Sequence, residues 1–589
     1  MIDATSAAAG GAVATAHQAA PRLDADAPLS ARQRRWVDST LAGLDLRGRV
    51  GQMLMVWVLG DYEHEDSPAF AEARRWVVEQ RVGGVVMSLG SPVEVAAKVN
   101  ALQRLAPVPL LVASDVEPGL GRLEGGVFAP SLMTAGSATV LPSNMAIGAA
   151  GDEHLAYEAG RVTARESRAV GIHMAFAPVA DVNNNPANPV INTRSFGEDP
   201  HAVARLTAAF VRGLQEHGVA ATAKHFPGHG DTDTDSHLAL PVVSSDPAQL
   251  DSVELVPFRA AIGAGALGVM TAHIALPAID ATNTPATLAP AIVDGLLRDS
   301  LGFRGVTVTD ALSMEGVGQG YTVERSAVLS VLAGADILLK PNDIARAIDA
   351  VVAAVGEGLI DTARIDRSAR RILELKARLG IADAPLVSLP AIRGTVASPE
   401  HQAVADSIAA RAITLLRDDG QVPLPPREQV SIVSYAPELD LLAGRAFAAT
   451  VRAARPDARV TRIDPRVSRA QLDSIAAGDG RIVVTTHVRT IEGEGRFAIA
   501  PHVAAWVDSL AAAGRPVVVV AFSNPYVIRQ FAGVPAYVVA YGRGEALERA
   551  AARALLGHAA IVGRAPISLP GFFSRGDGMT RPAATEVAR

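Results

Sequence analysis

The stretch VAATAKHFPGHG (residues 219–230) begins as a continuous apolar run and ends in a dense group of polar residues. Near-continuous apolar strands alternating with helices are what a parallel sheet buried on both faces requires. Seven further runs of this kind, each adjoining a helical pattern, are MLMVWVLG (53–60), VGGVVMSL (82–89), PLLVASDVE (109–117), HMAFAPVADV (173–182), ALGVMTAHI (266–274), GVTVTDAL (305–312) and ADILLKP (335–341). Together the eight runs predict an α/β fold, a closed (β/α)8 barrel of the TIM type.

Polar residues gather at the carboxyl-terminal ends of these apolar runs. Active sites of such barrels lie on the face formed by those ends, whereas a purely structural role would place polar residues equally at the other face. The pattern therefore indicates an active site built from several strand ends. Its members are Asp115, Asp181, Lys224, His225, His273, Asp310 and Lys340.

A second domain follows the barrel. The segment 381–400 is proline-rich and poor in periodicity, which is typical of a linker. Beyond it, VSIVSYAP (430–437), RIVVTTHV (481–488), PVVVVAFSNP (516–525) and AYVVAY (536–541) are predicted as buried strands of a smaller α/β sandwich. We expect a disordered leader over 1–29, the barrel over 30–380 with a helix over 30–48, the linker over 381–400 and the sandwich over 401–589.

Composition excludes several classes of protein. The formal net charge of the 589 residues is −7, whereas a nucleic-acid-binding protein normally carries a basic surplus. The chain has no cysteine, which excludes disulfides, thiolate nucleophiles and iron–sulfur clusters. No signal-peptide pattern and no apolar run of about 18 residues is found in this sequence, so we expect no membrane span, and we expect the cytoplasm as the default location unless an export signal lies outside this sequence. Only four lysines stand among its basic residues, which suggests a role for some of them.

The densest polar cluster is KHFPGHGDTDTDSH (residues 224–237), for which three interpretations compete. A calcium loop starting at Asp231 would need Gly at its sixth position and Glu at its twelfth, where Ser236 and Val242 stand. A zinc site at His225, His229 and His237 would need a helix, which the Pro-Gly pair forbids. The third interpretation is an acid/base loop in which Asp235, two residues before His237 in an extended segment, holds its imidazole.

Other strand-end residues are ambiguous by themselves. Asp310 either takes part in chemistry or caps the next helix. Asp115 has the same ambiguity, with the charged residues Glu117 and Arg122 nearby as possible members of ion pairs. Arg194, in the polar loop that follows the fourth run, offers a two-pronged donor to hydroxyls or a carboxylate.

Several segments together resemble glycoside hydrolase family 3, most closely its β-N-acetylglucosaminidase (β-N-acetylhexosaminidase) branch. They are LPSNMAIGAAG (141–151), FAPVADVNNNPANPVINTRSFGEDP (176–200), KHFPGHGDTDTDSHLALP (224–241) and VTDALSMEGV (308–317). The resemblance implies a retaining mechanism with Asp310 as nucleophile and His237, supported by Asp235, as acid/base. It also implies that the substrate is bound by Asp115, Arg122, Arg194, Lys224 and His225. Arg122 is shifted relative to the family pattern, Asp-x-Glu-Gly-Gly-Arg.

The resemblance implies a cofactor-free and metal-free enzyme whose partner is a small glycan carrying terminal N-acetylglucosamine, such as a cell-wall muropeptide. A β-glucosidase or broad β-hexosidase of the same family is the nearest alternative, for which Glu492 and Glu494 would be acid candidates. A neutral imidazole base does not repel an anion, so phosphorolysis is a further alternative. A non-catalytic sugar-binding protein is the alternative from another class. The oligomeric state is undetermined.

Overall fold

All eight apolar runs of the first part of the chain form parallel strands in the computed structural model, which describes residues 21–24, 27–121, 138–438, 440–478, 480–488 and 498–584. The strands are β1 (Leu54–Leu59), β2 (Gly84–Ser88), β3 (Leu111–Ser114), β4 (Met174–Ala175), β5 (Ala220–Phe226), β6 (Gly268–Thr271), β7 (Val306–Thr309) and β8 (Leu338–Leu339). They pair in the order β7-β6-β5-β4-β3-β2-β1-β8. A parallel bridge between Val308 and Ile337 joins the two ends of this order, so the predicted barrel is confirmed.

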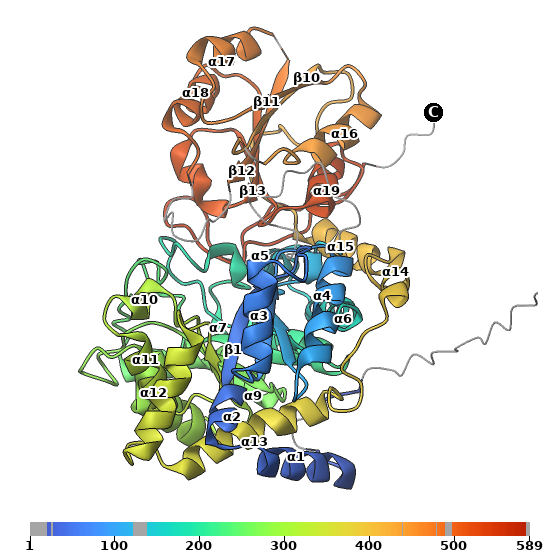
Figure 1. Ribbon diagram of the computed structural model, residues 1–589. Coiled ribbons are helices and arrows are strands. Elements are labelled where there is room, and N and C mark those ends of the chain that lie inside the picture. Colours follow the sequence, from blue (N-terminus) through green and yellow to red (C-terminus); the bar gives the residue numbers. More distant parts are fainter. Residues whose placement is uncertain are drawn as a thin grey trace, which may run out of the picture.

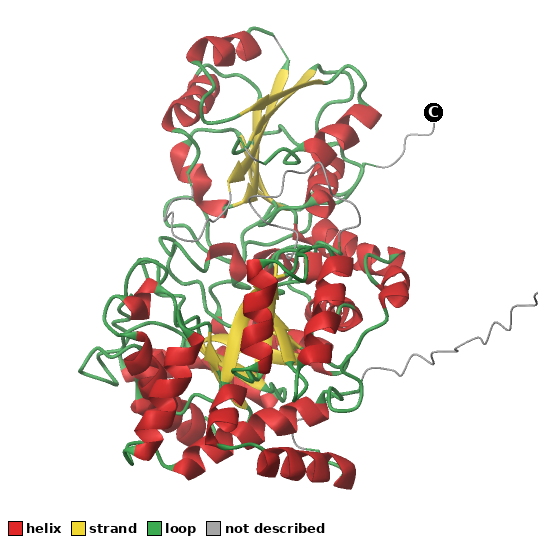
Figure 2. Ribbon diagram, viewed as in Figure 1, coloured by secondary structure: helices red, strands yellow, loops and turns green. Residues whose placement is uncertain are grey.

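Helices form a ring around the strands of the barrel (Figure 2). Four of them start at a Ser-Pro or Asp-Pro pair, with Ser67, Ser91, Asp199 and Asp246 as caps. The side-chain oxygen of each cap accepts a hydrogen bond from a backbone N–H of the first turn. Proline suits the next position because an N–H there would have no partner within the helix. These starts are therefore set locally by the sequence.

The helical elements of the barrel region have the following bounds. They are α1 (Ala31–Gly43), α2 (Leu46–Gln52), α3 (Pro68–Val78), α4 (Pro92–Leu105), α5 (Asn144–Ala150), α6 (Glu153–Ala169), η3 (Asn192–Arg194), α7 (Pro200–Gln215), α8 (Pro247–Ser252), α9 (Leu255–Gly263), η4 (Ala286–Leu288), the π-helix η5 (Ala291–Ser300), α10 (Glu315–Gly318), α11 (Val323–Ala333), α12 (Ile344–Gly356) and α13 (Thr362–Arg378). The single helix expected over 30–48 is wrong, because Asp45 caps a second helix, α2, by accepting a hydrogen bond from the Gly48 N–H.

The second sheet stands above the barrel in Figure 1 and has the order β11-β10-β12-β13-β14-β9. Only β9 is antiparallel to its neighbour. The strands are β9 (Thr414–Asp418), β10 (Val430–Tyr435), β11 (Arg459–Ile463), β12 (Arg481–Val488), β13 (Val517–Ser523) and β14 (Ala536–Val539). The four predicted strands are present. The two unpredicted ones, β9 and β11, are the edges of the sheet, where half-exposed strands carry charged residues instead of a long apolar run.

Helices cover both faces of this second sheet, with α17 and α18 on one side and α16 and α19 on the other (Figure 1). The helical elements after the barrel are η6 (Leu389–Ala391), α14 (Ile392–Thr395), α15 (Pro399–Ala412), α16 (Arg445–Ala454), α17 (Arg469–Ala476), α18 (Pro501–Ala512), η7 (Pro525–Gln530) and α19 (Glu545–Leu555). The chain is therefore an α/β protein of two domains, a barrel followed by a layered α/β domain, as the sequence predicts.

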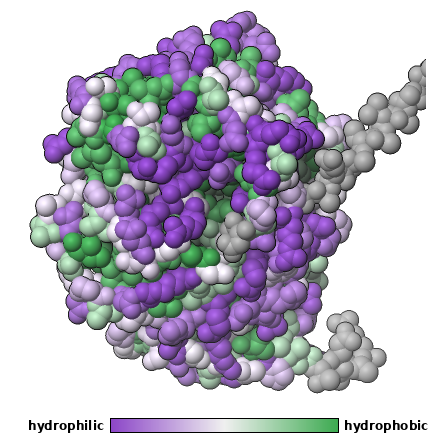
Figure 3. Space-filling model, turned by 90° about the horizontal axis from the view of Figure 1, so that it is seen from below, coloured by the Kyte–Doolittle hydropathy of each residue, from purple (hydrophilic) through white to green (hydrophobic). Residues whose placement is uncertain are grey.

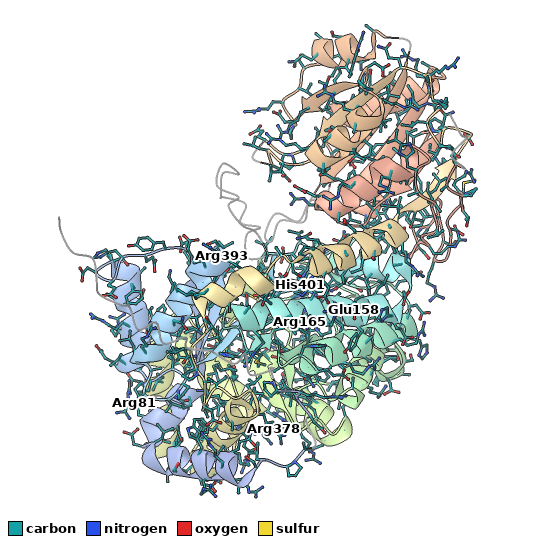
Figure 4. All side chains as sticks on the ribbon, turned by 90° about the vertical axis from the view of Figure 1, so that its right-hand side faces the viewer. Arg81, Glu158, Arg165, Arg378, Arg393 and His401 are labelled. Atoms are coloured by element: carbon teal, nitrogen blue, oxygen red, sulfur yellow. The ribbon has the colours of Figure 1, made fainter. Side chains whose placement is uncertain are left out.

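A buried carboxylate fastens the second domain to the barrel. His401 of α15 lies against α6, the helix that carries Glu158 and Arg165 (Figure 4). Its Nδ1 lies 2.8 Å from Oε1 of Glu166, a side chain with no solvent exposure. Glu166 also accepts hydrogen bonds from the N–H and hydroxyl of Thr139 and from the Ala397 N–H. Since Ala397 lies in the expected linker, the end of that segment is held on the barrel.

The lower end of the barrel is mainly hydrophilic, with scattered hydrophobic areas (Figure 3). Within the described residues, no helix is both long enough and apolar enough to cross a membrane.

Candidate active site

Six strands of the barrel deliver polar side chains to its carboxyl-terminal end. Asp115 follows β3, Asp181 follows β4, Lys224 and His225 lie near the end of β5, His273 follows β6, Asp310 follows β7 and Lys340 follows β8. The second domain contacts the same end, because the Asn183 side-chain amide donates a 2.8 Å hydrogen bond to the Tyr526 hydroxyl oxygen. The polar strand ends thus lie on the side of the barrel that meets the second domain.

A buried glutamate holds two of the predicted binding residues together. Glu117 accepts two hydrogen bonds from the Arg194 guanidinium, at 2.8 and 3.0 Å, and its Oε1 lies 2.8 Å from the Lys224 ammonium. Lys224 also donates to Asp115, at 2.7 Å. The side chain of Glu117 has no solvent exposure, whereas that of Asp115 is half exposed. A bidentate carboxylate partner fixes the plane of a guanidinium, so Arg194 is oriented before any ligand arrives.

Asp181 orients His225, as Glu117 orients Arg194. Its carboxylate lies 2.7 Å from His225 Nδ1 and accepts a 2.7 Å hydrogen bond from the His229 N–H. Burial raises the pKa of Asp181, but His225 and His229 outweigh this effect and the net pKa is lowered. The carboxylate is therefore ionised at neutral pH and accepts a hydrogen bond from Nδ1–H of His225, so that Nε2 of His225 faces Arg194, 3.4 Å away.

Asp310 follows β7 at the same carboxyl-terminal end of the barrel, here called its mouth. One of its oxygens accepts a 2.7 Å hydrogen bond from the Ala311 N–H. Burial raises the pKa of Asp310, but His273, His225, the Ala311 N–H and Lys224 together lower it below its usual value. His273 is itself fixed, since its two ring nitrogens lie 2.9 Å from Thr287 Oγ1 and from the Ala311 carbonyl oxygen. The Asp310 carboxyl is thus ionised at neutral pH.

The capping alternative for Asp310 does not hold. The next helix, α10, starts after Met314, and its first turn receives no side-chain cap. Asp310 therefore lies outside the position from which it would cap that helix.

Asp235 and His237 form the contact that the sequence predicts, but by a different local geometry. Oδ1 of Asp235 accepts a 2.8 Å hydrogen bond from the His237 N–H and lies 2.7 Å from His237 Nδ1. This carboxylate-to-backbone bond closes a turn over residues 236–238, so the expectation of an extended segment is wrong. The Asp235 side chain is 2% exposed and that of His237 is 28% exposed. Nδ1 faces the carboxylate, so Nε2 is the ring nitrogen that points away from Asp235.

The loop that carries His237 is tied to the segment after Asp310. The Gly316 N–H donates a 3.1 Å hydrogen bond to the Ser236 carbonyl oxygen, and the Gln319 side chain donates to the Leu238 carbonyl oxygen at 3.0 Å. A Cβ at Gly316 would come within 2.9 Å of the Ser236 carbonyl oxygen, so only glycine allows this approach. These contacts hold the loop against the segment that follows Asp310.

The metal-site interpretations of this loop find no support in its contacts. The Nδ1 atoms of His225, His229 and His237 each face a different partner, namely Asp181, Thr232 and Asp235. Across the part of the chain that the structure describes, no three or more His, Asp or Glu side chains gather in a way that would hold a metal ion.

Of the predicted site residues, seven lie in these networks: Asp115, Arg194, Lys224, His225, Asp235, His237 and Asp310. Arg122, Glu492 and Glu494 lie outside the described residues. From the sequence, Asp181 was placed at a strand end and Glu117 was noted as a charged neighbour of Asp115, and neither was given a role in the site. Their positions after β3 and β4, the two strands that come before β5 with Lys224 and His225 in the barrel, are the signal that could have assigned both carboxyl groups to hold those residues.

Comparison with known proteins identifies both domains. Residues 45–375 match the family described as "Glycosyl hydrolase family 3 N terminal domain", and residues 392–581 match "Glycosyl hydrolase family 3 C-terminal domain".

Individual relatives agree with these matches. A β-N-acetylglucosaminidase/β-glucosidase of Cellulomonas fimi is 33% identical over 68% of this chain and 70% of its own length. β-Hexosaminidase A of Pseudoalteromonas piscicida is 35% identical over 59% of this chain and 62% of its own. Among solved structures, a family 3 β-N-acetylglucosaminidase from Paenibacillus sp. has a TM-score of 0.79 and 36% identity, covering 89% of this chain and 99% of that one. A β-glucoside phosphorylase has a TM-score of 0.80 and 25% identity, covering 92% and 97%.

Proposed function

Because this chain belongs to glycosyl hydrolase family 3 and is a β-hexosaminidase-like glycoside hydrolase, we propose that it is a retaining exo-glycosidase that releases terminal β-linked N-acetylglucosamine. The observation that carries the proposal is the Asp235–His237 pair, on a loop hydrogen-bonded to the segment that follows Asp310. An ionised carboxylate and a carboxylate-held imidazole are the two groups that a double-displacement reaction needs.

In the first step, Asp310 attacks the anomeric carbon. The bond from that carbon to the leaving-group oxygen breaks, and Nε2 of His237 gives its proton to that oxygen, leaving a glycosyl ester on Asp310. In the second step, a water molecule gives a proton to Nε2 and attacks the anomeric carbon, and the ester bond breaks. Two inversions restore the β configuration. The lowered pKa of Asp310 supports the first step, because the nucleophile must be ionised.

The remaining residues are assigned to the bound sugar. Asp115, Arg194, Lys224 and His225 present hydrogen-bond acceptors and donors to its hydroxyl groups, and Arg122 is proposed for the same role from the family pattern. Sites built from such buried groups discriminate strongly, because an analogue that lacks a hydroxyl leaves them unpaired. Asp181 is proposed to position His225. The natural substrate is proposed to be a small glycan, such as a peptidoglycan-derived muropeptide.

Two alternatives within the family have specific support. The Cellulomonas relative bears the double name β-N-acetylglucosaminidase/β-glucosidase, which favours testing glucosides. A β-glucoside phosphorylase of similar fold, together with the histidine acid/base, favours testing phosphate as the acceptor in the second step. In that reaction phosphate oxygen takes the place of water and the product is a sugar 1-phosphate.

The test compares nitrophenol release from the β-N-acetylglucosaminide and the β-glucoside, each with and without phosphate. We expect preference for the acetamido sugar at a rate independent of phosphate. In His237→Gly, the glycosyl ester on Asp310 should accumulate and be seen by mass spectrometry of the intact protein and its peptides. Asp233→Asn, an exposed change in the same loop, is the matched control. An ester on another residue, or none, would overturn the mechanism.

A further inference from the structure

Trp57 is a large aromatic side chain exposed at the mouth of the barrel. It lies on β1, where side chains alternate between two faces. On one face, Val56 and Val58 are almost fully buried, as expected for residues under the surrounding helices. On the other face, Met55 is buried, whereas Trp57 is 40% exposed. Exposure thus increases toward the carboxyl-terminal end of the strand, so Trp57 faces the open mouth.

Lys340 is placed over this tryptophan by the end of the neighbouring strand. Its ammonium nitrogen lies 3.6 Å from the centre of the Trp57 ring, a cation–π contact. The Lys340 N–H donates a 2.8 Å hydrogen bond to the Met55 carbonyl oxygen, which fixes the residue two positions before Trp57 on β1. Its backbone has φ +46°, in the left-handed region that a residue with a side chain rarely adopts. Such strained residues persist where surrounding contacts hold them, and they cluster at ligand sites.

The other lysines have different surroundings. Lys98, Lys224 and Lys376 are all buried and hydrogen-bonded to Glu63, Asp115 and Gln52, respectively. Lys340 is partly exposed instead. Of the four lysines, Lys224 and Lys340 lie at the ends of barrel strands, and Lys340 is the partly exposed one of these two.

The Trp57–Lys340 pair is close to the proposed nucleophile in the order of the strands. β8 lies between β1 and β7. The Leu312 N–H, two residues after Asp310, donates a 2.9 Å hydrogen bond to the carbonyl oxygen of Leu339, the residue before Lys340. The pair therefore sits on the rim of the mouth beside Asp310, while the groups assigned to the bound sugar come from β3 and β5 and from the loop after β4.

We propose that Trp57 and Lys340 form the subsite for the leaving group, in which the indole stacks on a sugar ring and the ammonium selects a ring that carries an acidic substituent. This inference rests on the proposed function. Sugar rings present flat C–H faces that pack on an aromatic face, and cation–π contact with Lys340 keeps the indole in one orientation. A carboxylate near the ammonium is attracted in a half-exposed environment, where screening by water is incomplete.

The experiment uses three disaccharides that differ at one position. Each has N-acetylglucosamine β-1,4-linked to a second N-acetylglucosamine, whose O3 carries hydrogen, a lactyl carboxylate or the corresponding lactyl amide. We expect the wild-type kcat/KM to be about tenfold higher for the carboxylate than for the amide, and this ratio to fall as salt is added. Lys340→Met should bring the ratio to about one, and Lys340→Arg should keep most of it. Arg370→Met, which removes a charge from α13, should leave the ratio unchanged.

Trp57→Ala tests the stacking contact. It should lower kcat/KM on all three disaccharides, mainly through KM, and leave hydrolysis of N-acetyl-β-glucosaminyl azide, whose leaving group has no ring, unchanged. Equal cleavage of the carboxylate and the amide by the wild type, or an unchanged ratio in Lys340→Met, would overturn the subsite. If neither the azide nor any disaccharide released N-acetylglucosamine, the proposed function would fail and the subsite with it. Release without discrimination would refute the subsite alone.

Discussion

Asp235→Asn removes a negative charge from behind His237 while keeping an acceptor oxygen in place. In the wild type, one carboxylate oxygen receives both the His237 N–H and the imidazole Nδ1, at 2.8 and 2.7 Å. The amide oxygen of asparagine can accept the same two hydrogen bonds, so the turn over residues 236–238 should survive. What changes is the stabilisation of the charged imidazolium, the form that donates a proton to the leaving group.

The size of the effect follows from the burial of Asp235. Its side chain is 2% exposed, so water screens the interaction little. A hydrogen bond to a charged group contributes about 1.5–3 kcal/mol and a neutral one about 0.5–1.5 kcal/mol. The expected loss of about 1–1.5 kcal/mol lowers the rate of a step that needs the proton by about five- to thirteenfold. Removing the imidazole itself, in His237→Gly, should cost about 10²- to 10⁴-fold in that step.

The assay measures kcat/KM on two substrates with different needs for protonation. N,N′-diacetylchitobiose has a poor leaving group and should show the full loss of kcat/KM. A dinitrophenyl glycoside should show little loss, because its dinitrophenolate leaves without needing a proton. In the His237→Gly background, Asp235→Asn should have no further effect on chitobiose, because it acts through the imidazole. Equal losses on both substrates, or additive losses in the double variant, would refute this reasoning.

Three buried groups outside the proposed chemistry give further predictions. Burial, with a smaller contribution from Asp231, raises the pKa of Glu254 to about 7 from 4.5. Between these pH values the folded state holds a proton that the unfolded state has lost, so the free energy of unfolding should fall by about 3 kcal/mol from pH 4.5 to 7. Glu254→Gln should flatten that part of the profile when urea unfolding is measured at a series of pH values. Burial lowers the pKa of Lys376 to about 7 from 10.5. Here the unfolded state holds the extra proton, so the free energy of unfolding should rise from pH 7 to 10.5. Lys376→Met should remove that rise. Glu117→Gln leaves Lys224 and Arg194 without their shared buried carboxylate and should cost about 3–5 kcal/mol in chemical denaturation and raise KM.

Each of these predictions has an outcome that would contradict it. A wild-type stability profile that is flat from pH 4.5 to 7, or one that Glu254→Gln leaves unchanged, would mean that Glu254 is ionised in the folded protein. A slope above pH 7 that persists in Lys376→Met would assign it to other groups. An unaltered KM in Glu117→Gln would show that Arg194 and Lys224 keep their positions without the carboxylate.

Local signals were sufficient for much of this fold. Each barrel strand is a short apolar run, and many helices start at a serine or aspartate cap. Strands and helix starts of this kind can be recognised from a few neighbouring residues. The edge strands β9 and β11 lack that signal. Their sequences, TLLRD and RVTRI, mix apolar and charged residues because only part of each strand is buried. Pairing with β14 and β10 makes them strands.

The order of residues along the chain was enough to place Asp115, Lys224, His225 and Asp310 at one end of the barrel, because parallel strands in a closed barrel bring all their carboxyl ends to the same face. Which of these side chains contact one another depends on how the folded chain packs. Arg194 meets Glu117, 77 positions earlier, and Lys224 meets Asp115, 109 positions earlier. The stacking of Lys340 on Trp57 likewise exists only because β8 closes the barrel against β1. Hydrogen bonds and ion pairs depend on distances of a few ångströms, and residues so far apart in the chain acquire those distances only when the strands pack.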